Sequence, residues 1–180
     1  KVQKDGMFQS INSNTINSIV PANLRGPNNE WVGIAKRSRV IYYNPVKVSA
    51  KEMEGLTYED LSDSKWKGRI AIRSSGNMYN QSLVASLISN HGVDATEQWA
   101  DGFVENFARK PEGNDRAQIM AVANGEADIA IANSYYIGLM LSGKKGEEQQ
   151  AAARKVELHF PGQDGRGAHI NVSGAGLMKN

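Results

Sequence analysis

The sequence predicts a fold of the α/β class, because short apolar strands alternate with helices along most of the chain. Two segments carry this prediction. A predicted strand over residues 69–73 precedes a helix over 78–90, and a second strand over 128–132 precedes a helix that runs to residue 141. Strands that alternate with helices in this way are typical of βαβ units rather than of all-α or all-β proteins.

The beginning of the chain predicts loops followed by one strand. Residues 1–30 lack hydrophobic periodicity and are rich in Asn, Ser, Gly and Pro, and the part over 21–29 predicts a loop. Residues 31–43 are dense in Val, Ile and Tyr, and the part over 39–43 predicts a strand that ends at the turn Asn44-Pro45.

Two further helices are expected in the middle of the chain. Residues 74–77 supply the turn and cap for the helix over 78–90, and Gly92 ends it. The next helix is predicted over 95–109, with Asp94 as its N-cap. Its aromatic residues recur at every fourth position and predict a stripe packed into the core. They are Trp99, Phe103 and Phe107.

The remaining elements complete the alternation. Asp115 and Gln118 match the capping-box pattern for a helix that ends at 124–125, just before the strand over 128–132. We also expect a charged, solvated helix over 144–154 and strands over 156–160 and 169–173.

Composition excludes several classes of function. The 180 residues suffice for one domain with its own core. The net charge is +2, and the 21 basic and 19 acidic residues are interspersed, so nucleic acid is not expected as a partner. The chain has no cysteine, which excludes disulfides, zinc-thiolate sites and cysteine nucleophiles.

Tyrosines follow both strands of the alternation. Tyr135 and Tyr136 come directly after the strand over 128–132 and its two-residue turn, and Tyr79 follows the strand over 69–73. If these strands are parallel neighbours, their carboxyl ends meet at the edge where open α/β sheets bind ligands. Neighbouring side chains of an ideal strand point to opposite faces, so the backbone has to turn before the pair if both are to share a ligand.

The three phenols indicate a hard metal ion of high charge. A phenol has an ordinary pKa of about 10 and must lose its proton before it can ligate. Ferric iron has the charge to achieve this and prefers hard oxygen donors. Three phenolates would offset its 3+ charge, which makes Tyr79, Tyr135 and Tyr136 candidate ligands for Fe³⁺.

A small anion such as carbonate is expected to complete the coordination shell. The turn from Ser74 to Asn77 leads into a helix N-terminus, where free amides and the helix dipole favour negative charge. Ser74 and Asn77 are therefore candidate anion contacts, and Arg39 and Arg73 add guanidinium donors.

Each of these features also has a purely structural interpretation. A tyrosine pair after a strand is more often packing than chemistry, and the turn over 74–77 is more often only a helix cap. Arg39 is equally suited to pairing with a carboxylate. The three histidines show no ligand spacing, so none is assigned to a metal. No nucleophile and base pattern is present, and no enzymatic activity is expected.

Four segments together carry a family resemblance that spans nearly the whole chain: 31–44, 73–83, 125–136 and 167–176. The tandem tyrosines, the upstream Tyr79 and both flanking strands occur in the family's order. In these segments the chain resembles the periplasmic ferric-ion-binding proteins that serve bacterial ABC-type iron importers.

The resemblance implies a lobe of the type II periplasmic binding protein fold, with a mixed, mostly parallel sheet flanked by helices. It implies that Tyr79, Tyr135 and Tyr136 ligate Fe³⁺ and that Arg39 lies near the metal or its carbonate. It also implies a protein of the periplasm, or one anchored at the cell surface, that delivers iron to the permease of an ABC importer.

The resemblance also divides the chain. Residues 1–38 are expected to be a remnant of an amino-terminal lobe, 39–176 the carboxyl-terminal lobe with hinge strands over 39–44 and 169–173, and 177–180 the start of a return to the first lobe. We expect both ends to be truncated and the amino-terminal lobe to be missing. Apolar surface left exposed in this way would favour self-association.

Two other functions stay open at this point. A related lobe would bind a small organic or oxyanion solute without metal, with the tyrosines stacking or hydrogen-bonding instead of ligating. A transferase-like enzyme that shares the two-lobed fold is the least supported, because the chain lacks a base and nucleophile pattern.

Overall fold

The structure, a computed structural model, describes residues 2–179. The chain forms two compact units. One combines the residues up to Arg37 with those from Ile170 onward, and the other runs from Ser38 to His169. No helix among the described residues is long and apolar enough to cross a membrane.

The first unit contains short elements paired at their edges. They are β1 (Phe8–Gln9), α1 (Asn14–Ile19), η1 (Ala22–Leu24), the first part of β2 (Val32–Tyr43), β6 (Ile170–Ala175) and β7 (Leu177–Met178). Strand β1 pairs with β7 in antiparallel fashion, and β6 pairs with β2. Residues 1–30 lack the periodicity that would predict a helix, but α1 forms there without burying a residue, because the Ser13 side chain caps it by accepting from the Ile16 amide.

The boundary between the units lies inside β2, between Arg37 and Ser38, one residue before the predicted boundary. The sequence groups 169–173 with the larger unit, whereas β6 lies in the smaller one. The reason is close backbone packing: a Cβ at Gly174 would lie only 3.0 Å from the Val32 carbonyl oxygen.

The larger unit alternates helices and strands, as predicted. Its elements are the rest of β2, α2 (Ala50–Met53), η2 (Glu59–Ser62), η3 (Ser64–Trp66), β3 (Ile70–Ala71), α3 (Met78–His91), α4 (Val93–Glu105), α5 (Asp115–Ala123), β4 (Ile129–Asn133), α6 (Tyr135–Leu141), α7 (Glu147–Ala153) and β5 (Glu157–His159). The prediction of the α/β class is confirmed.

The sheet of this unit is mixed and has the strand order β3-β4-β2-β5. Strands β3 and β4 are parallel, whereas β2 is antiparallel to both β4 and β5. The parallel part is thus smaller than the sequence predicts. Local pattern identifies the βαβ unit from β3 to β4, but it does not show in which direction a distant strand such as β2 enters the sheet.

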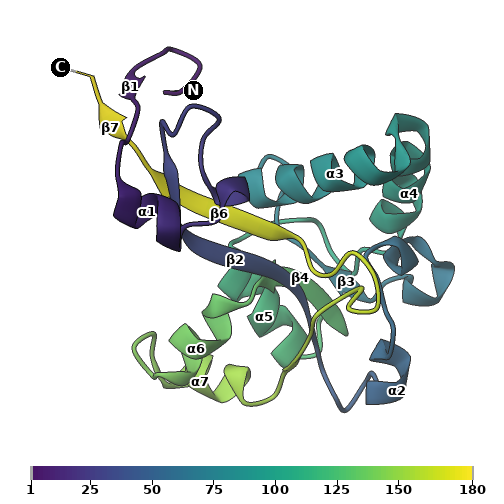
Figure 1. The fold of residues 1–180 in the computed structure, drawn as a ribbon. Helices are drawn as coiled ribbons and strands as arrows, with labels where there is room; N and C mark the ends of the chain where they lie inside the picture. The colour runs from purple at the N-terminus through teal and green to yellow at the C-terminus, as the bar shows by residue number, and fades with distance from the viewer. Residues whose placement is uncertain (1, 180) are drawn as a thin grey trace. The chain divides into compact units, whose positions relative to one another are not determined.

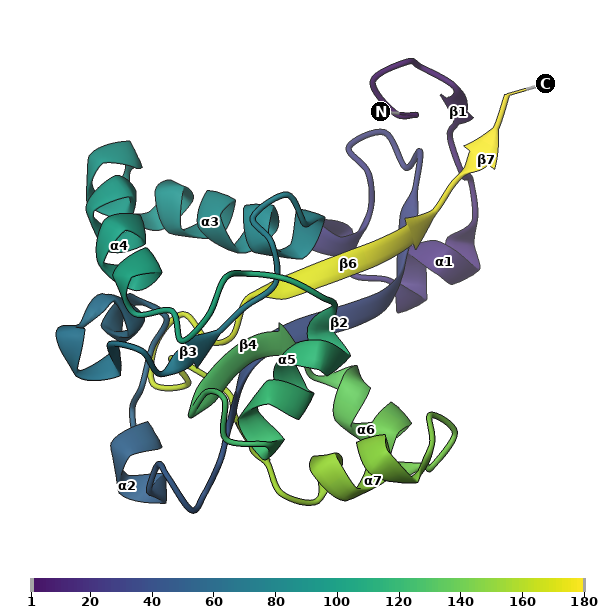
Figure 2. The same ribbon diagram turned by 180° about the vertical axis from the view of Figure 1, so that it is seen from behind.

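The side chains of the central strands alternate between two cores. Ile129 and Ile131 of β4 pack with the core that includes α3 and α4, while Ala130 and Ala132 pack with the core that includes α5, α6 and α7. Figures 1 and 2 show α3 and α4 on one side of β3 and β4, and α5 to α7 on the other. Small alanine side chains let the helices of the second side approach the sheet closely.

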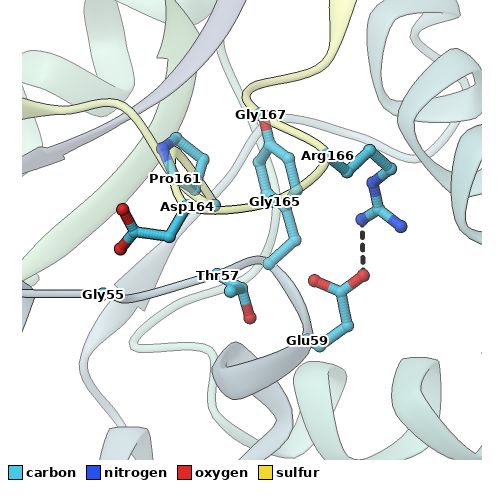
Figure 3. Close-up of a pocket in the computed structure, with 10 residues that line it drawn as sticks. Gly55, Thr57, Glu59, Pro161, Asp164, Gly165, Arg166 and Gly167 are labelled. Atoms are coloured by element: carbon cyan, nitrogen blue, oxygen red, sulfur yellow. Dashed lines mark hydrogen bonds and ion pairs between the residues drawn. The ribbon is translucent and has the colours of Figure 1, made fainter.

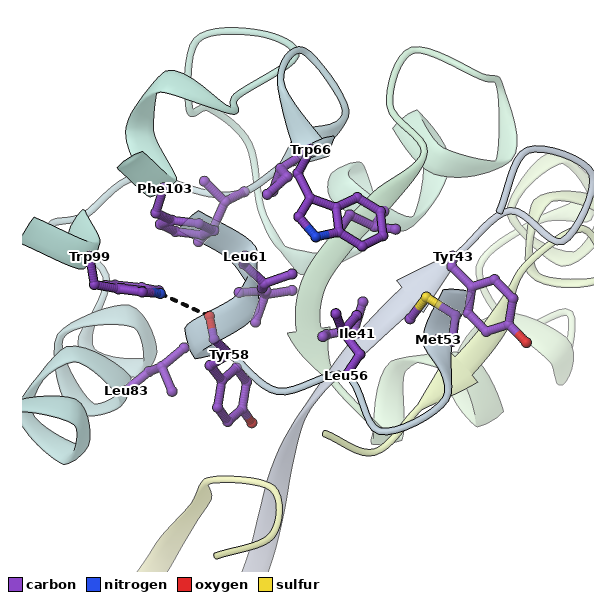
Figure 4. Close-up of a cluster of buried hydrophobic side chains, with 14 of the residues drawn as sticks. Ile41, Tyr43, Met53, Leu56, Tyr58, Leu61, Trp66, Leu83, Trp99 and Phe103 are labelled. Carbon is purple, nitrogen blue, oxygen red and sulfur yellow. Dashed lines mark hydrogen bonds between the residues drawn. The ribbon is translucent and has the colours of Figure 1, made fainter. Parts of the chain in front are cut away.

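Aromatic residues fill the first core, as the predicted stripe requires. The rings of Trp99 and Phe103 stack with centroids 4.6 Å apart. The Trp99 indole donates to the Tyr58 carbonyl oxygen at 2.8 Å, drawn as the dashed line in Figure 4. Phe107 is only partly buried and lies beyond the end of α4, which is shorter than predicted. The helix ends because Asn106 turns inward and the Ala108 amide pairs with the Ile70 carbonyl oxygen at 2.8 Å.

Candidate metal site

The three tyrosines predicted as ligands begin the helices that follow two parallel strands. Tyr79 lies in the first turn of α3, after β3, and Tyr135 and Tyr136 are the first two residues of α6, after β4. Because β3 and β4 are adjacent and parallel, both helices start at the carboxyl edge of the same sheet.

The turn that the tyrosine pair requires is present. Strand β4 ends at Asn133 and α6 begins at Tyr135. The buried Tyr42 hydroxyl donates to the carbonyl oxygens of Asn133 and Ser134 at 3.0 and 3.2 Å, which holds this turn from below. As a result the Tyr135 and Tyr136 rings lie together, with centroids 4.2 Å apart and planes tilted by 31°.

The environment of the pair favours the protonated form of Tyr136. The pKa of Tyr136 is raised above its ordinary value, first by burial, then by a hydrogen bond with Tyr135, and also by the charges of Tyr135, Asp115 and Tyr79. Tyr79 therefore acts on the same phenol, although it lies more than 50 residues away in the sequence. Tyr135 is 42% exposed, while Tyr79 and Tyr136 are half-buried.

Arg39 is fully buried beside this group of tyrosines. Its Nη1 contacts an Asp115 carboxylate oxygen at 3.1 Å, its Nη2 donates to Asn80 Oδ1 at 2.7 Å, and its Cζ lies 5.9 Å from the centre of the Tyr79 ring. Burial lowers the arginine pKa, and the charge of Asp115 opposes that effect. The geometry favours the carboxylate-pairing interpretation of Arg39, and contact with a bound anion stays a prediction.

Asp115 has a different role from the one predicted. Asn114 is the N-cap of α5, because its Oδ1 accepts from the Ala117 amide at 3.2 Å. Asp115 is instead buried and bound to Arg39, and Gln118 donates to the carbonyl oxygens of Glu112 and Asn114. The capping-box prediction is therefore wrong, since a first-turn carboxylate can also face a buried cation.

The turn before α3 serves as a helix cap. Asn77 Oδ1 accepts from the Tyr79 amide at 3.1 Å, and Ser74 Oγ accepts from the Gly76 amide at 3.2 Å. These contacts occupy acceptors, while the Ser74 hydroxyl proton and the Asn77 Nδ2 amide are donors without a protein partner among residues 2–179. Arg73 lies next to them, 21% exposed and 3.4 Å from Asp115.

Sequence reasoning missed three polar residues at this edge: Asn80, Asp115 and Asn133, each with at most 6% of its surface exposed. The signal for Asn133 was available, because it ends an apolar run as a polar residue. Asn80 and Asp115 gave no such signal, since both lie in ordinary helical positions.

The described residues offer no second metal site of the common histidine and carboxylate type. Within residues 2–179, no cluster of three or more His, Asp or Glu side chains is arranged to hold a metal ion. A pocket of about 430 Å³ lies elsewhere, between the loop 161–167 and the segment 55–59. Two of its charged groups, Arg166 and Glu59, pair with each other, as Figure 3 shows.

Comparisons with known proteins show the family. The model of the bacterial extracellular solute-binding protein family matches residues 1–168. The chain is 52% identical to iron uptake protein A1 of Synechocystis over 99% of this chain and 49% of that protein. It is 30% identical to the Fe(3+)-binding periplasmic protein of Serratia marcescens over 96% of this chain and 48% of that protein. It thus spans about half the length of these curated relatives.

Solved structures agree with this assignment. A Trichodesmium protein (IdiA, FutA) in complex with iron and citrate matches with a TM-score of 0.92 at 56% identity, over 99% of this chain and 55% of that one. A ferric binding protein from Campylobacter jejuni matches with a TM-score of 0.90 at 37% identity, over 98% and 55%. The chain belongs to the family of bacterial extracellular solute-binding proteins, with the type II periplasmic binding protein fold.

Proposed function

We propose that this chain binds ferric iron as transported cargo through the phenolates of Tyr79, Tyr135 and Tyr136. The observation that supports the proposal is that all three tyrosines lie in the first turns of the helices that follow the parallel strands β3 and β4. The iron-related names of its relatives agree with it.

The charges of the site suit a trivalent ion. Three phenols lose three protons when one Fe³⁺ binds, so the net charge of the edge does not change. The raised pKa of Tyr136 means that this phenol holds its proton until the ion displaces it. Iron binding is therefore expected to weaken as the pH falls.

A small anion such as carbonate or citrate completes the shell in this proposal. The donors of Ser74 and Asn77, together with the Arg73 guanidinium, are suited to a carboxylate-like group. Arg39 is fully buried and paired with Asp115, so it supports the site from within the protein, and its direct contact with the anion stays a prediction. The relative that was solved with iron and citrate supports an accompanying carboxylate.

For the whole protein we propose carriage of iron in the periplasm, or from an anchor at the cell surface, to the permease of an ABC importer. Relatives described as periplasmic iron-binding proteins support this place and role. The family is one of binding proteins, and no catalytic step is assigned to this chain.

The test is a titration with ferric citrate followed by visible absorption, because phenolate bound to Fe³⁺ absorbs visible light. The wild type should develop the band, and Tyr135→Phe with Tyr136→Phe should abolish it. Tyr43→Phe is the matched control, since Tyr43 pairs with Ile129 at the opposite end of β4 and should leave the band unchanged. A colourless wild type, or colour that survives the double substitution, would exclude the site.

The alternative is a lobe that binds a small oxyanion or organic solute without metal. The unpaired donors at Ser74 and Asn77 favour it. Calorimetry separates the two proposals: this alternative predicts heat when the protein is titrated with metal-free citrate or phosphate, and no binding heat when it is titrated with ferric ion.

A further inference from the structure

A buried polar network links the segments that carry the three tyrosines. The Arg39 guanidinium contacts Asp115 at the start of α5, Asn80 in the first turn of α3, and both Asn133 Oδ1 at 3.4 Å and the Ile131 carbonyl oxygen at 3.2 Å in β4. One side chain thus joins the amino ends of two helices to the end of the strand that leads into the tyrosine pair.

Asn80 is the part of this network next to Tyr79. Its Oδ1 accepts from Arg39, and its Nδ2 donates to the carbonyl oxygens of Arg73 and Ser74 at 2.8 and 3.2 Å. These bonds hold the first turn of α3 against the end of β3. With 6% of its surface exposed, Asn80 is shielded from water, so its side chain has one well-defined geometry.

The other end of the network holds the tyrosine pair. Asp115 Oδ2 accepts from the Asn133 backbone amide at 3.2 Å in addition to Arg39. Asp115 therefore offsets the arginine charge and also fixes the residue that precedes the α6 turn. The bonds of Asn80 and those of Asp115 both involve the Arg39 guanidinium. The spacing between Tyr79 and the Tyr135–Tyr136 pair therefore depends on this guanidinium.

We propose that Asn80 is a positioning residue for iron binding, which sets the place of Tyr79 relative to Tyr135 and Tyr136 through Arg39. The proposal rests on the function proposed above. The exchange of three protons for Fe³⁺ leaves the net charge of the edge unchanged, so iron binding does not need the network to balance charge. The network contributes to iron binding by placing the tyrosine ligands. Loss of Asn80 should then resemble loss of the Tyr79 ligand.

The test compares Asn80→Ala with Tyr79→Phe in a ferric citrate titration. Asn80→Ala should shift the visible band in the same direction as Tyr79→Phe and weaken iron binding by about 10- to 100-fold, the range typical of residues that orient a metal ligand. Asn90→Ala is the matched control, because Asn90 lies on the same helix and is exposed, and within residues 2–179 its side chain bonds only to the Ser86 carbonyl oxygen.

The outcomes separate this proposal from the function it rests on. A wild type without a band contradicts iron binding itself. A wild-type band with an Asn80→Ala band at the same position and strength, even in a protein of lower melting temperature, overturns the positioning role. If Asn80→Ala does not fold, Asn80→Asp retains the acceptor for Arg39 and loses the donors to residues 73 and 74. It should shift the band in the same direction, and an unshifted band would overturn the proposal.

Discussion

The two ends of β4 each carry an ion pair between arginine and aspartate, but in opposite surroundings. At the carboxyl end, Arg39 and Asp115 have fully buried side chains 3.1 Å apart. At the amino end, Arg69 and Asp128 approach to 2.6 Å with 25% and 17% of their side chains exposed, and Lys47 adds a contact to Asp128 at 3.3 Å.

The difference shows what each pair contributes. Water still reaches the partly exposed pair, so its net contribution to stability is smaller than that of a fully buried pair. The buried pair loses hydration that its mutual attraction barely repays, and it needs Asn80 and Asn133 to satisfy its remaining groups. A buried pair of this kind is poor evidence for stability. Its position beside three tyrosines suits the placement of those side chains.

The largest expected effect is on stability when each aspartate is neutralised. Asp115→Asn leaves Arg39 buried without its counter-charge and should lower the free energy of unfolding by about 3 to 5 kcal/mol. Asp128→Asn at the other end should cost less than about 1 kcal/mol. Urea unfolding of the metal-free proteins measures both, and equal losses would contradict the comparison.

Unfolding at alkaline pH provides a second comparison of the two ends of β4. Burial raises the pKa of Tyr58, whose hydroxyl donates to the Arg39 carbonyl oxygen, to about 12. The unfolded chain loses this proton near pH 10 and the folded chain only near 12, so the stability it provides is present below pH 10 and is lost as the pH rises. The expected slope between these values is roughly 1.4 kcal/mol per pH unit, and Tyr58→Phe should remove it.

At the amino end a different cause acts on Tyr43. A hydrogen bond to Glu157 raises the pKa of Tyr43 to about 12. Glu157→Gln should therefore reduce the loss of stability at alkaline pH. The pKa of Tyr58 is raised mainly by burial, so replacing one of its neighbours should not have the same effect. Urea unfolding at several pH values from 9.5 to 12 distinguishes the two, and a Glu157→Gln protein with the wild-type slope would refute the assigned cause.

The smallest effect concerns the anion. Asn77→Asp retains the acceptor that caps α3 but replaces the Nδ2 donors with a negative oxygen. Stability should stay within about 0.5 kcal/mol of the wild type, while bicarbonate should no longer strengthen iron binding. Asn114→Asp changes the equivalent cap of α5 and should keep the bicarbonate effect. Loss of that effect in both variants, or in neither, would argue against an anion at Asn77.

Most of the larger unit could be predicted from local pattern. The run over 128–132 and the turn that follows it predicted β4 and α6, and thereby the place of the tyrosine pair. Helix ends were less predictable. Hydrophobic spacing continued α4 to residue 109, but pairing of the backbone around Ala108 with Ile70 ended the helix at Glu105. Long-range hydrogen bonds of this kind have no local signature.

The sequence by itself determined the elements of this protein and the positions of Tyr79, Tyr135 and Tyr136 after strands, because apolar periodicity and turn residues act over a few neighbours. Only the tertiary structure decided the direction of β2, the place of β6, and the pairing of Arg39 with Asp115. Those two residues are separated by 76 positions in the sequence. The two charged groups pair because both are buried away from water. Their burial depends on the elements that the whole fold places around them.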